Sequence, residues 1–295
     1  MSETRFLIVD GNSIGCRAAF VPPVLKNSKG RETGGTYRFF AMLNSVLKQV
    51  RPTHVLIAFD IARENFRTEI DPKYKANREV RSSDDSLYYQ FEDIKSILTE
   101  IGIKHIGIYG YEADDVIGTY ATNSTADRNF ILTGDKDAFQ LISDNTVVLF
   151  PQTGASDIKK YDKEAFTEKF DIDVSQFIDM KALMGDDGDN VKGIEKCGQK
   201  TAAKWLKAYG DLDSIINHAD EIKGKIGENL RAWIPNADMT KQLVTIKRDV
   251  PVPYDFKECE IDIQWDNSLP IFKELECFSI MKQISGGKFY NVYKG

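Results

Sequence analysis

Residues 5–12 have the sequence RFLIVDGN, in which an apolar run ends at Asp10. The apolar run at 55–59 ends in the same way, at Asp60. A short apolar run bounded by Gly or Asp indicates a buried strand. Because the carboxyl ends of parallel strands share one edge of a sheet, where ligands bind, we expect the two aspartates to lie close together.

Further carboxylates follow other apolar runs or lie in the glycine-containing segment 184–190, and they bring the set to nine. Carboxylates gathered at one edge repel each other unless cations neutralise them. Oxygen ligands select Mg²⁺ or Mn²⁺ over zinc, which prefers Cys and His. The sequence therefore predicts a site for hard divalent cations, expected to be two, with the candidate ligands Asp10, Asp60, Glu112, Asp114, Asp115, Asp135, Asp137, Asp186 and Asp189.

Each acidic group also has a simpler interpretation. Acidic residues are favoured in the first turn of a helix, so one or two of the three acids at 112–115 could be ordinary capping residues. Asp135 and Asp137, two apart in an expected extended segment, should point the same way and share one ion. Segment 186–189 lacks the ligand spacing of an EF-hand, which argues against a calcium loop. Three acids within four residues exceed what capping needs, so we favour the metal interpretation.

Strand and helix alternate as far as about residue 150, which is typical of an α/β fold with a mainly parallel sheet flanked by helices. We expect strands at 5–10, 54–60, 104–109, 129–134 and 146–150, and helices at 34–50, 113–123 and 137–143. From about residue 162 the pattern is helical, with helices predicted at 162–169, 174–184, 199–208, 211–218, 220–233 and 237–247. Two extended runs follow, and then a core-packing helix at 268–284.

The chain of 295 residues has a formal net charge of −6. Setting the nine carboxylates aside leaves 36 acids against 39 Lys and Arg, so the overall acidity does not exclude a polyanionic partner. The apolar runs are too short for a membrane span, and the N-terminus does not resemble a signal peptide. With four scattered cysteines, the expectation is a cytoplasmic monomer with reduced thiols.

Two further segments suit nucleic acid. The stretch 61–95 mixes basic with aromatic residues, which favours phosphate pairing and base stacking, although a solvated surface loop can have the same composition. Segment 193–202 has a glycine turn before a helix, which can aim backbone N–H groups at a phosphate. The three histidines lie apart, and the sequence has neither a G-x-S-x-G motif nor a P-loop. These features converge on metal-dependent hydrolysis of a phosphodiester.

In these segments the chain resembles the 5′ nucleases, a family of flap endonucleases, bacteriophage 5′→3′ exonucleases and the 5′-nuclease domain of bacterial DNA polymerase I. The matching motifs occur in family order: IVDGN at 8–12, AFD at 58–60, YKANR at 74–78, EADD at 112–115, TGDKD at 133–137, MGDDGDN at 184–190, and Gly193 followed by KTA at 200–202. The resemblance implies a PIN-like 5′-nuclease core, a helical arch formed by 61–95, and a helix-three-turn-helix motif at about 191–209.

The resemblance also implies roles for individual residues. Asp10, Asp60, Glu112 and Asp114 would hold the first metal, and Asp115, Asp135, Asp137, Asp186 and Asp189 would hold or support the second. Lys75 and Arg78 would reach the scissile phosphate and offset the charge of the transition state, and Tyr74 would stack on a base. The residues implied to hold the duplex backbone are Lys196, Gly198, Lys200 and Thr201.

The turn at 196–198 departs from the family pattern. The family has Gly-Ile-Gly there and often holds K⁺ on the turn carbonyls, whereas this chain has Lys196-Cys197-Gly198. Lysine lacks the freedom of glycine at positive φ. We therefore expect an altered turn, which puts K⁺ binding in question and offers an extra lysine to phosphate.

The expected function is a structure-specific 5′ nuclease acting on flap, nicked or branched DNA, and on RNA primers paired with DNA, in a bacterial or phage-infected cell. Its rivals are a PIN-like ribonuclease, a non-catalytic branched-DNA-binding homologue and a hydrolase of small nucleotides. The glycine turn argues against the first, the intact acidic set against the second, and the expected arch against the third. The expected domains are a catalytic core at 1–165, a duplex-binding region at 166–250, and a segment at 251–295 that packs on the core.

Overall fold

The computed structural model describes residues 3–78, 85–153 and 157–285. A six-stranded sheet lies at its centre, in the order β3-β2-β1-β4-β5-β6. Five strands run parallel: β1 (Arg5–Asp10), β2 (His54–Ala58), β3 (Lys104–Ile106), β4 (Arg128–Leu132) and β5 (Thr146–Pro151). β6 (Ile158–Tyr161) is antiparallel to β5 at the edge. The predicted mainly parallel sheet is confirmed, and the strand order reverses beside β1, the kind of position where ligands bind.

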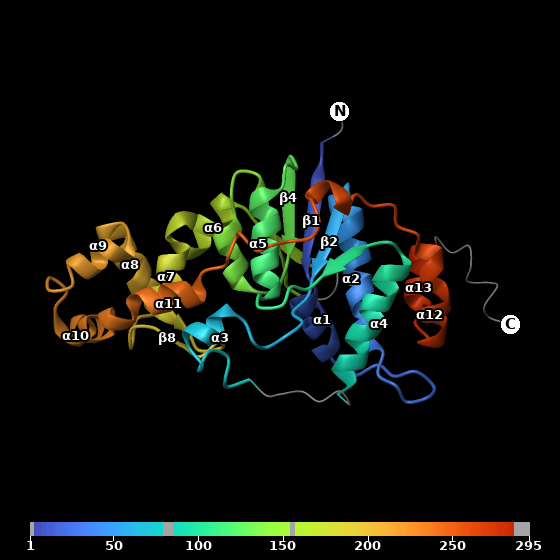
Figure 1. Ribbon diagram of the computed structural model, residues 1–295, viewed down its shortest axis with the longest axis horizontal. Coiled ribbons are helices and arrows are strands. Elements are labelled where there is room, and N and C mark those ends of the chain that lie inside the picture. The colour runs from blue at the N-terminus through green and yellow to red at the C-terminus, as the bar shows by residue number, and fades with distance from the viewer. Residues whose placement is uncertain (1–2, 79–84, 154–156, 286–295) are drawn as a thin grey trace.

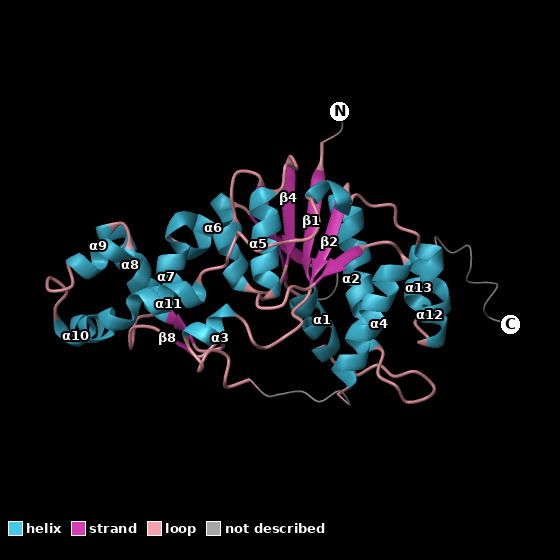
Figure 2. Ribbon diagram, viewed as in Figure 1, coloured by secondary structure: helices cyan, strands magenta, loops and turns pink. Residues whose placement is uncertain are grey.

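Alternate residues of β1 pack into two different cores, one on each face of the sheet. Phe6 and Ile8 pack with residues of α5 (Ala113–Asn123) in one core cluster. Leu7 and Val9 pack in the other with residues of α2 (Gly34–Val50). Figure 2 shows the sheet flanked by helices, with α4 (Ser86–Glu100) on the same side as α2. The helix α1 (Gly11–Phe20) begins directly after β1, so Asp10 lies at a strand-to-helix junction.

The helical region lies beyond one edge of the sheet (Figure 1). It contains α6 (Lys163–Phe170), α7 (Phe177–Met184), α8 (Gln199–Tyr209), α9 (Leu212–Asn217), α10 (Gly224–Trp233) and α11 (Ala237–Val244). Between α7 and α8, β7 (Gly185–Asp186) pairs with β8 (Val191–Lys192). A Cβ atom on Gly193 would come within 2.2 Å of the Gly185 backbone nitrogen, so this close approach requires glycine. The tight pair fixes where Asp186 points.

The last helices of the described chain pack on the core. α12 (Leu269–Glu274) and α13 (Phe278–Ile284) contribute to the same core cluster as α2. The prediction of one helix at 268–284 is wrong, because the chain breaks between them at Glu276, where φ is +58°. The tyrosine-rich end of the chain, 286–295, lies outside the described residues.

The stretch 61–95 contains a short helix, α3 (Phe66–Ile70), then turns over 71–78 and the first residues of α4. Residues 79–84 of the expected arch lie outside the described residues. The predicted helix at 137–143 is instead a 3₁₀ helix, Lys136–Leu141, which the side chain of Asp135 caps. The expectation that Asp135 and Asp137 lie in an extended segment is therefore wrong. None of the helices in the described ranges is long and apolar enough to cross a membrane.

Candidate active site

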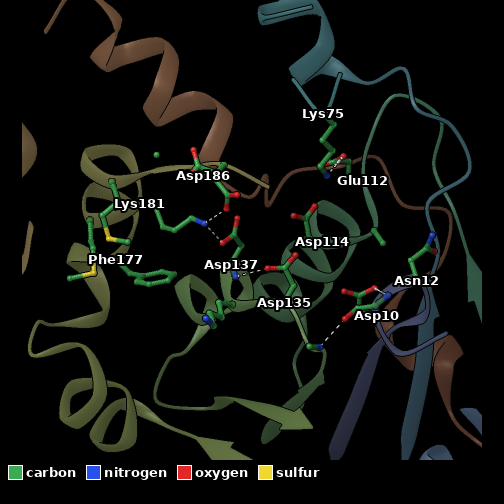
Figure 3. A pocket seen from close by; sticks show the side chains of 18 of the residues that line it. Asp10, Asn12, Lys75, Glu112, Asp114, Asp135, Asp137, Phe177, Lys181 and Asp186 are labelled. Carbon is green, nitrogen blue, oxygen red and sulfur yellow. Dashed lines mark hydrogen bonds and ion pairs between the residues drawn. The ribbon is translucent and has the colours of Figure 1, made fainter. Parts of the chain in front are cut away.

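An acidic cavity of about 860 Å³ opens at the carboxyl edge of the sheet, where the sheet meets the helical region (Figure 3). Its walls come from the ends of β1 and β2, the start of α5, the loop after β4, and the segment around β7. Seven of the nine predicted ligands line it, namely Asp10, Asp60, Glu112, Asp114, Asp135, Asp137 and Asp186. The structure thus brings together acids that are up to 176 residues apart in the sequence.

On one side of the acidic cavity lie three carboxylates with few positive partners. Asp10 caps α1 and accepts hydrogen bonds from the Ser13 backbone N–H at 2.9 Å and the Thr133 hydroxyl at 2.8 Å. Burial nevertheless raises the pKa of Asp10 to about 7. Burial also raises the pKa values of Asp60 and Asp114. Within the described ranges, the buried Oδ1 of Asp114 has no hydrogen-bond partner. This side of the cavity therefore has excess negative charge that a cation would relieve.

On the other side, a lysine that the sequence analysis missed lies between two of the acids. The Nζ of Lys181 is 2.6 Å from Asp137 and 2.5 Å from Asp186 (Figure 3). Burial raises the pKa of Asp137 to about 6. At Asp186 burial also acts to raise the pKa, but the hydrogen bond and charge of Lys181 together with the backbone N–H groups of Asp189 and Gly188 lower it overall. In the part of the chain that the structure describes, no three acidic, Cys or His side chains already converge as a ligand set. The only sequence signal for Lys181 was a lysine near the end of the helix before 184–190.

Two residues of the YKANR motif hold Glu112. The Nζ of Lys75 lies 2.5 Å from Oε1 of Glu112, and the Tyr74 hydroxyl lies 2.8 Å from Oε2. Lys75 has a φ of +52°, and such backbone strain is often found at functional sites. Tyr74 is only 4% exposed, so its ring is not free to stack on a base. The predicted stacking role of Tyr74 is therefore wrong in this conformation, and the hydroxyl is the part of the side chain that faces the acids.

Asp189 binds the expected arch rather than lining the acidic cavity. Its Oδ1 accepts a hydrogen bond from Arg78 at 2.5 Å, and its Oδ2 lies 3.0 Å from the Tyr74 hydroxyl. Its backbone carbonyl accepts a hydrogen bond from the Lys75 N–H. Asp189 does not itself line the cavity but binds Arg78, which does, so of its two predicted roles the supporting one fits this position better.

Asp115 is also a structural residue. It is fully buried, and both of its oxygens accept hydrogen bonds from the Arg67 guanidinium at 2.8 Å. The Lys247 and Glu112 backbone N–H groups donate to the same carboxylate. Asp115 thus points into the protein and is linked to Glu112 through Arg67 and the Glu112 N–H, so of its two predicted roles the supporting one fits this position better. Arg67 belongs to the stretch 61–95, whose basic residues were expected to pair with phosphate, but it is only 2% exposed and also donates to the carbonyl of Thr245 after α11.

The turn at 196–198 keeps a left-handed residue despite the lysine. Lys196 has a φ of +68°, so the expectation that lysine would alter the turn by avoiding this conformation is wrong. Cys197 packs into the core, while Lys196, Gly198 and Lys200 are exposed where α8 begins. Thr201 is half-buried. Exposed lysines and the free N–H groups of a helix start are suitable partners for a phosphate.

A mainly parallel sheet with acids at its carboxyl edge, beside a helical region that contains a glycine turn, defines the class of 5′ nucleases. Residues 5–171 match the model of the 5′-3′ exonuclease N-terminal resolvase-like domain. Residues 172–267 match the model of the 5′-3′ exonuclease C-terminal SAM fold. The chain therefore belongs to the 5′-3′ exonuclease family.

Similar curated proteins are bacterial DNA polymerases I. The one from Mycobacterium bovis is 40% identical over 255 residues, which are 85% of this chain and 28% of that protein. The one from Bacillus subtilis is 35% identical over 289 residues, which are 96% of this chain and 33% of that protein. The chain thus spans about a third of the length of these relatives, or less.

Similar solved structures are nucleases. A bacteriophage T5 flap endonuclease in a pseudo-enzyme-product complex with DNA and metal ions is 25% identical, with a TM-score of 0.67 over 81% of this chain and 88% of that chain. Human GEN1 in complex with Holliday junction DNA is 15% identical, with a TM-score of 0.63 over 93% of this chain and 68% of that chain. At this lower identity, GEN1 supports the fold alone.

Proposed function

We propose that the chain is a structure-specific 5′ nuclease that hydrolyses phosphodiester bonds near 5′ ends in flap, nicked or branched DNA, with two Mg²⁺ or Mn²⁺ ions. The observation that carries the proposal is the acidic cavity, in which seven of the predicted ligands line one space together with Lys75 and Arg78. Membership of the 5′-3′ exonuclease family supports the reaction, and the T5 enzyme, whose complex contains DNA and metal ions, supports the substrate class.

The residues present fit divalent cations. The ligands are all oxygen atoms, and the buried Oδ1 of Asp114 lacks a partner among the described residues. Asp10, Asp60, Glu112 and Asp114 would hold one ion, and Asp135, Asp137 and Asp186 the other. When bound, such ions activate water and stabilise the leaving oxygen of a phosphodiester.

The chain's own cations would position the substrate. Lys75 and Arg78 come from the same motif and line the acidic cavity, where they can bind the scissile phosphate and offset the charge of the transition state. Lys181 neutralises part of the charge on Asp137 and Asp186 and holds the two carboxylates together. The positive side chains and the carboxylates would thus surround one phosphodiester in fixed positions.

The direct test is cleavage of a 5′-labelled flap, a nicked duplex and a flap with a blocked 5′ end, each with Mg²⁺ and with EDTA. Asp135→Ala and Asp186→Ala should each lower turnover by at least a hundredfold while DNA binding survives, because each removes a proposed ligand of the same ion. Asp262→Ala, which removes an exposed carboxylate outside the acidic cavity, is the matched control and should cleave like the wild type.

Retained cleavage by both variants at saturating Mg²⁺ would contradict the assignment of two metals. Cleavage in EDTA would contradict metal dependence altogether. The blocked flap reports on how the substrate enters, since its cleavage would count against threading of a free 5′ end through the expected arch.

A further inference from the structure

The acidic cavity already contains a cation of the chain's own. Lys181 lines the cavity, and its Nζ lies 2.6 Å from Oδ1 of Asp137 and 2.5 Å from Oδ2 of Asp186 (Figure 3). The lysine side chain is only 12% exposed, so the ammonium exchanges most of its water for these two carboxylates. Asp137 and Asp186 are proposed ligands of the same divalent ion. One positive group therefore lies between the oxygens that this ion would bind.

The lysine connects two parts of the fold. Lys181 lies near the end of α7 in the helical region, whereas Asp137 lies in the 3₁₀ helix Lys136–Leu141 that follows β4. Asp186 lies on β7, which the chain enters through Gly185 at a φ of +72°. Without the ammonium, two carboxylates from separate segments would meet with no cation between them and repel each other. The ion pairs thus keep this side of the cavity assembled when no metal is bound.

Asp186 has one oxygen that a side-chain movement can release. Its Oδ1 accepts a hydrogen bond from the backbone N–H of Asp189 at 3.1 Å, inside the turn after β7. That donor is fixed by the main chain. The other oxygen, Oδ2, is held by Lys181, whose charge is carried on a flexible stem of four carbons. An ion can therefore bind Oδ2 of Asp186 once the ammonium has moved.

The two sides of the cavity differ in this respect. Among the described residues, Asp10, Asp60 and Asp114 form no ion pair, and Glu112 is the one proposed ligand of the first ion that does. On the other side, the ammonium engages two of the three proposed ligands of the second ion. The second ion therefore has to compete with a fixed positive charge, whereas the first ion meets three carboxylates that hold none.

Two positive groups repel each other when they bind the same carboxylate oxygens. Mg²⁺ binds such oxygens at about 2.0–2.1 Å, which is closer than the Nζ of Lys181 lies to them. An ion and an ammonium on the same two oxygens would be a few ångströms apart in a partly buried space, where like charges interact strongly. The ion has twice the charge and the shorter contacts, so the ammonium is the group that leaves. The cavity of about 860 Å³ gives its side chain room to do so.

We propose that Lys181 is an internal counter-ion that holds the place of the second divalent ion and is displaced from Asp137 and Asp186 when that ion binds. The proposal rests on the proposed function for the existence of the second ion. It adds that the chain's own lysine sets the affinity for this ion, because two ligands that compete for one site lower each other's affinity.

The test measures metal binding without a substrate. Mn²⁺ is titrated into the full chain, and the free ion is quantified by its electron paramagnetic resonance signal. Lys181→Met and Lys181→Gln remove the charge, and Lys181→Arg keeps it. The matched control is Lys136→Met, since Lys136 is exposed, lines the same cavity and forms no ion pair among the described residues. A further pair, Asp186→Asn with and without Lys181→Met, identifies the ion that is affected.

The two neutral variants of Lys181 should bind the second Mn²⁺ ion about tenfold more tightly than the wild type, which is a coupling of ordinary size. Lys181→Arg should stay within about twofold of the wild type because it keeps the charge, and so should Lys136→Met, whose exposed charge is screened. Asp186→Asn should lose one of the two binding events, and the addition of Lys181→Met should not restore it.

Thermal unfolding gives a second readout. In EDTA, Lys181→Met should have a lower Tm than the wild type, since Asp137 and Asp186 lose their counter-ion. At saturating Mn²⁺ the difference should vanish or reverse, because the ion replaces the ammonium and stabilises the folded state to which it binds. A lysine that served only packing would lower the Tm by the same amount under both conditions.

An affinity for the second ion that is unchanged or weaker in the neutral variants would overturn the proposal. An equal gain in Lys136→Met would do the same, because the charge of the whole cavity would then explain it, and so would a Tm deficit that persists at saturating Mn²⁺. These outcomes leave the proposed function intact, since cleavage by the wild type tests it separately. A wild type that binds no Mn²⁺ at all would instead refute the two-metal function, and this proposal with it.

Discussion

Asp114 and Asp115 are neighbours in the first turn of α5, yet they lie in opposite surroundings. Asp114 lines the acidic cavity, and one of its buried oxygens lacks a hydrogen-bond partner among the described residues. Asp115 points into the protein and binds Arg67 through both oxygens. Because a helix turns by about 100° per residue, adjacent side chains can face different regions. Of two aspartates that are neighbours in the sequence, one thus lines the acidic cavity and the other forms an internal ion pair.

The difference shows where this protein accepts unpaired charge. Around Asp115 each carboxylate oxygen has a donor, as buried charges need. Around Asp114 burial raises the pKa of the carboxyl, and one of its oxygens lacks a hydrogen-bond partner among the described residues, which costs stability. Substitution of Asp114 should therefore lower activity, whereas substitution of Asp115 should lower stability.

The largest expected effect is on the cavity side. Asp114→Asn should lower single-turnover cleavage at saturating Mg²⁺ by at least a thousandfold, about 4 kcal/mol of barrier, because it removes a proposed metal ligand. The unfolding free energy in EDTA, measured with urea, should not fall, since an amide replaces a buried carboxyl that has no cationic partner in contact. An Asp114→Asn protein that is inactive because it is unfolded would break the contrast.

The next effect is on the interior side. Asp115→Ala should lower the unfolding free energy by about 3 kcal/mol, because it leaves the Arg67 guanidinium buried without its carboxylate. Urea denaturation measures the loss, and Asp262→Ala controls for removal of an exposed carboxylate. A loss below about 1 kcal/mol would show that Arg67 does not depend on Asp115.

The contrast also marks how far the sequence could predict the site. The carboxyl ends of parallel strands lie at one edge of a sheet, and this rule correctly placed Asp10, Asp60 and Asp135 together. It could not separate Asp114 from Asp115, since that depends on the rotation of α5 against its neighbours. Nor could it find Lys181, whose partner Asp137 comes from a distant part of the sequence.

The same limit applies to the fold. The strands and the long helix α2 follow from periodicity, which is a local property. The break at Glu276 and the buried position of Tyr74 are set by tertiary packing, which composition does not record. Burial decided whether a basic or aromatic residue of 61–95 was a structural or a surface residue, as Arg67 illustrates.

A third test uses pH on the cavity side. The pKa of Asp10 is raised to about 7, so the folded protein binds more protons than the unfolded chain between about pH 4 and 7. The metal-free protein should therefore lose stability as pH rises, by up to about 2 kcal/mol between pH 5.5 and 7. Urea titrations in EDTA should show a weaker pH dependence for Asp10→Asn than for the wild type. An unchanged dependence would mean that Asp10 keeps its ordinary pKa.

The smallest effect concerns Tyr74, which lies between the cavity and the arch. Its hydroxyl is within hydrogen-bonding distance of both Glu112 and Asp189, so its single O–H can donate to either carboxylate. Glu112 is a proposed metal ligand, and Asp189 binds Arg78. Tyr74→Phe keeps the buried ring and removes only this bond, which should lower cleavage about five- to tenfold, the equivalent of roughly 1 kcal/mol. Tyr74→Leu, which also removes the ring, should cost stability as well. If the ring acted by stacking on a base, Tyr74→Phe would cleave like the wild type and only Tyr74→Leu would lose affinity for DNA. The pair of variants therefore decides between the hydroxyl and the ring.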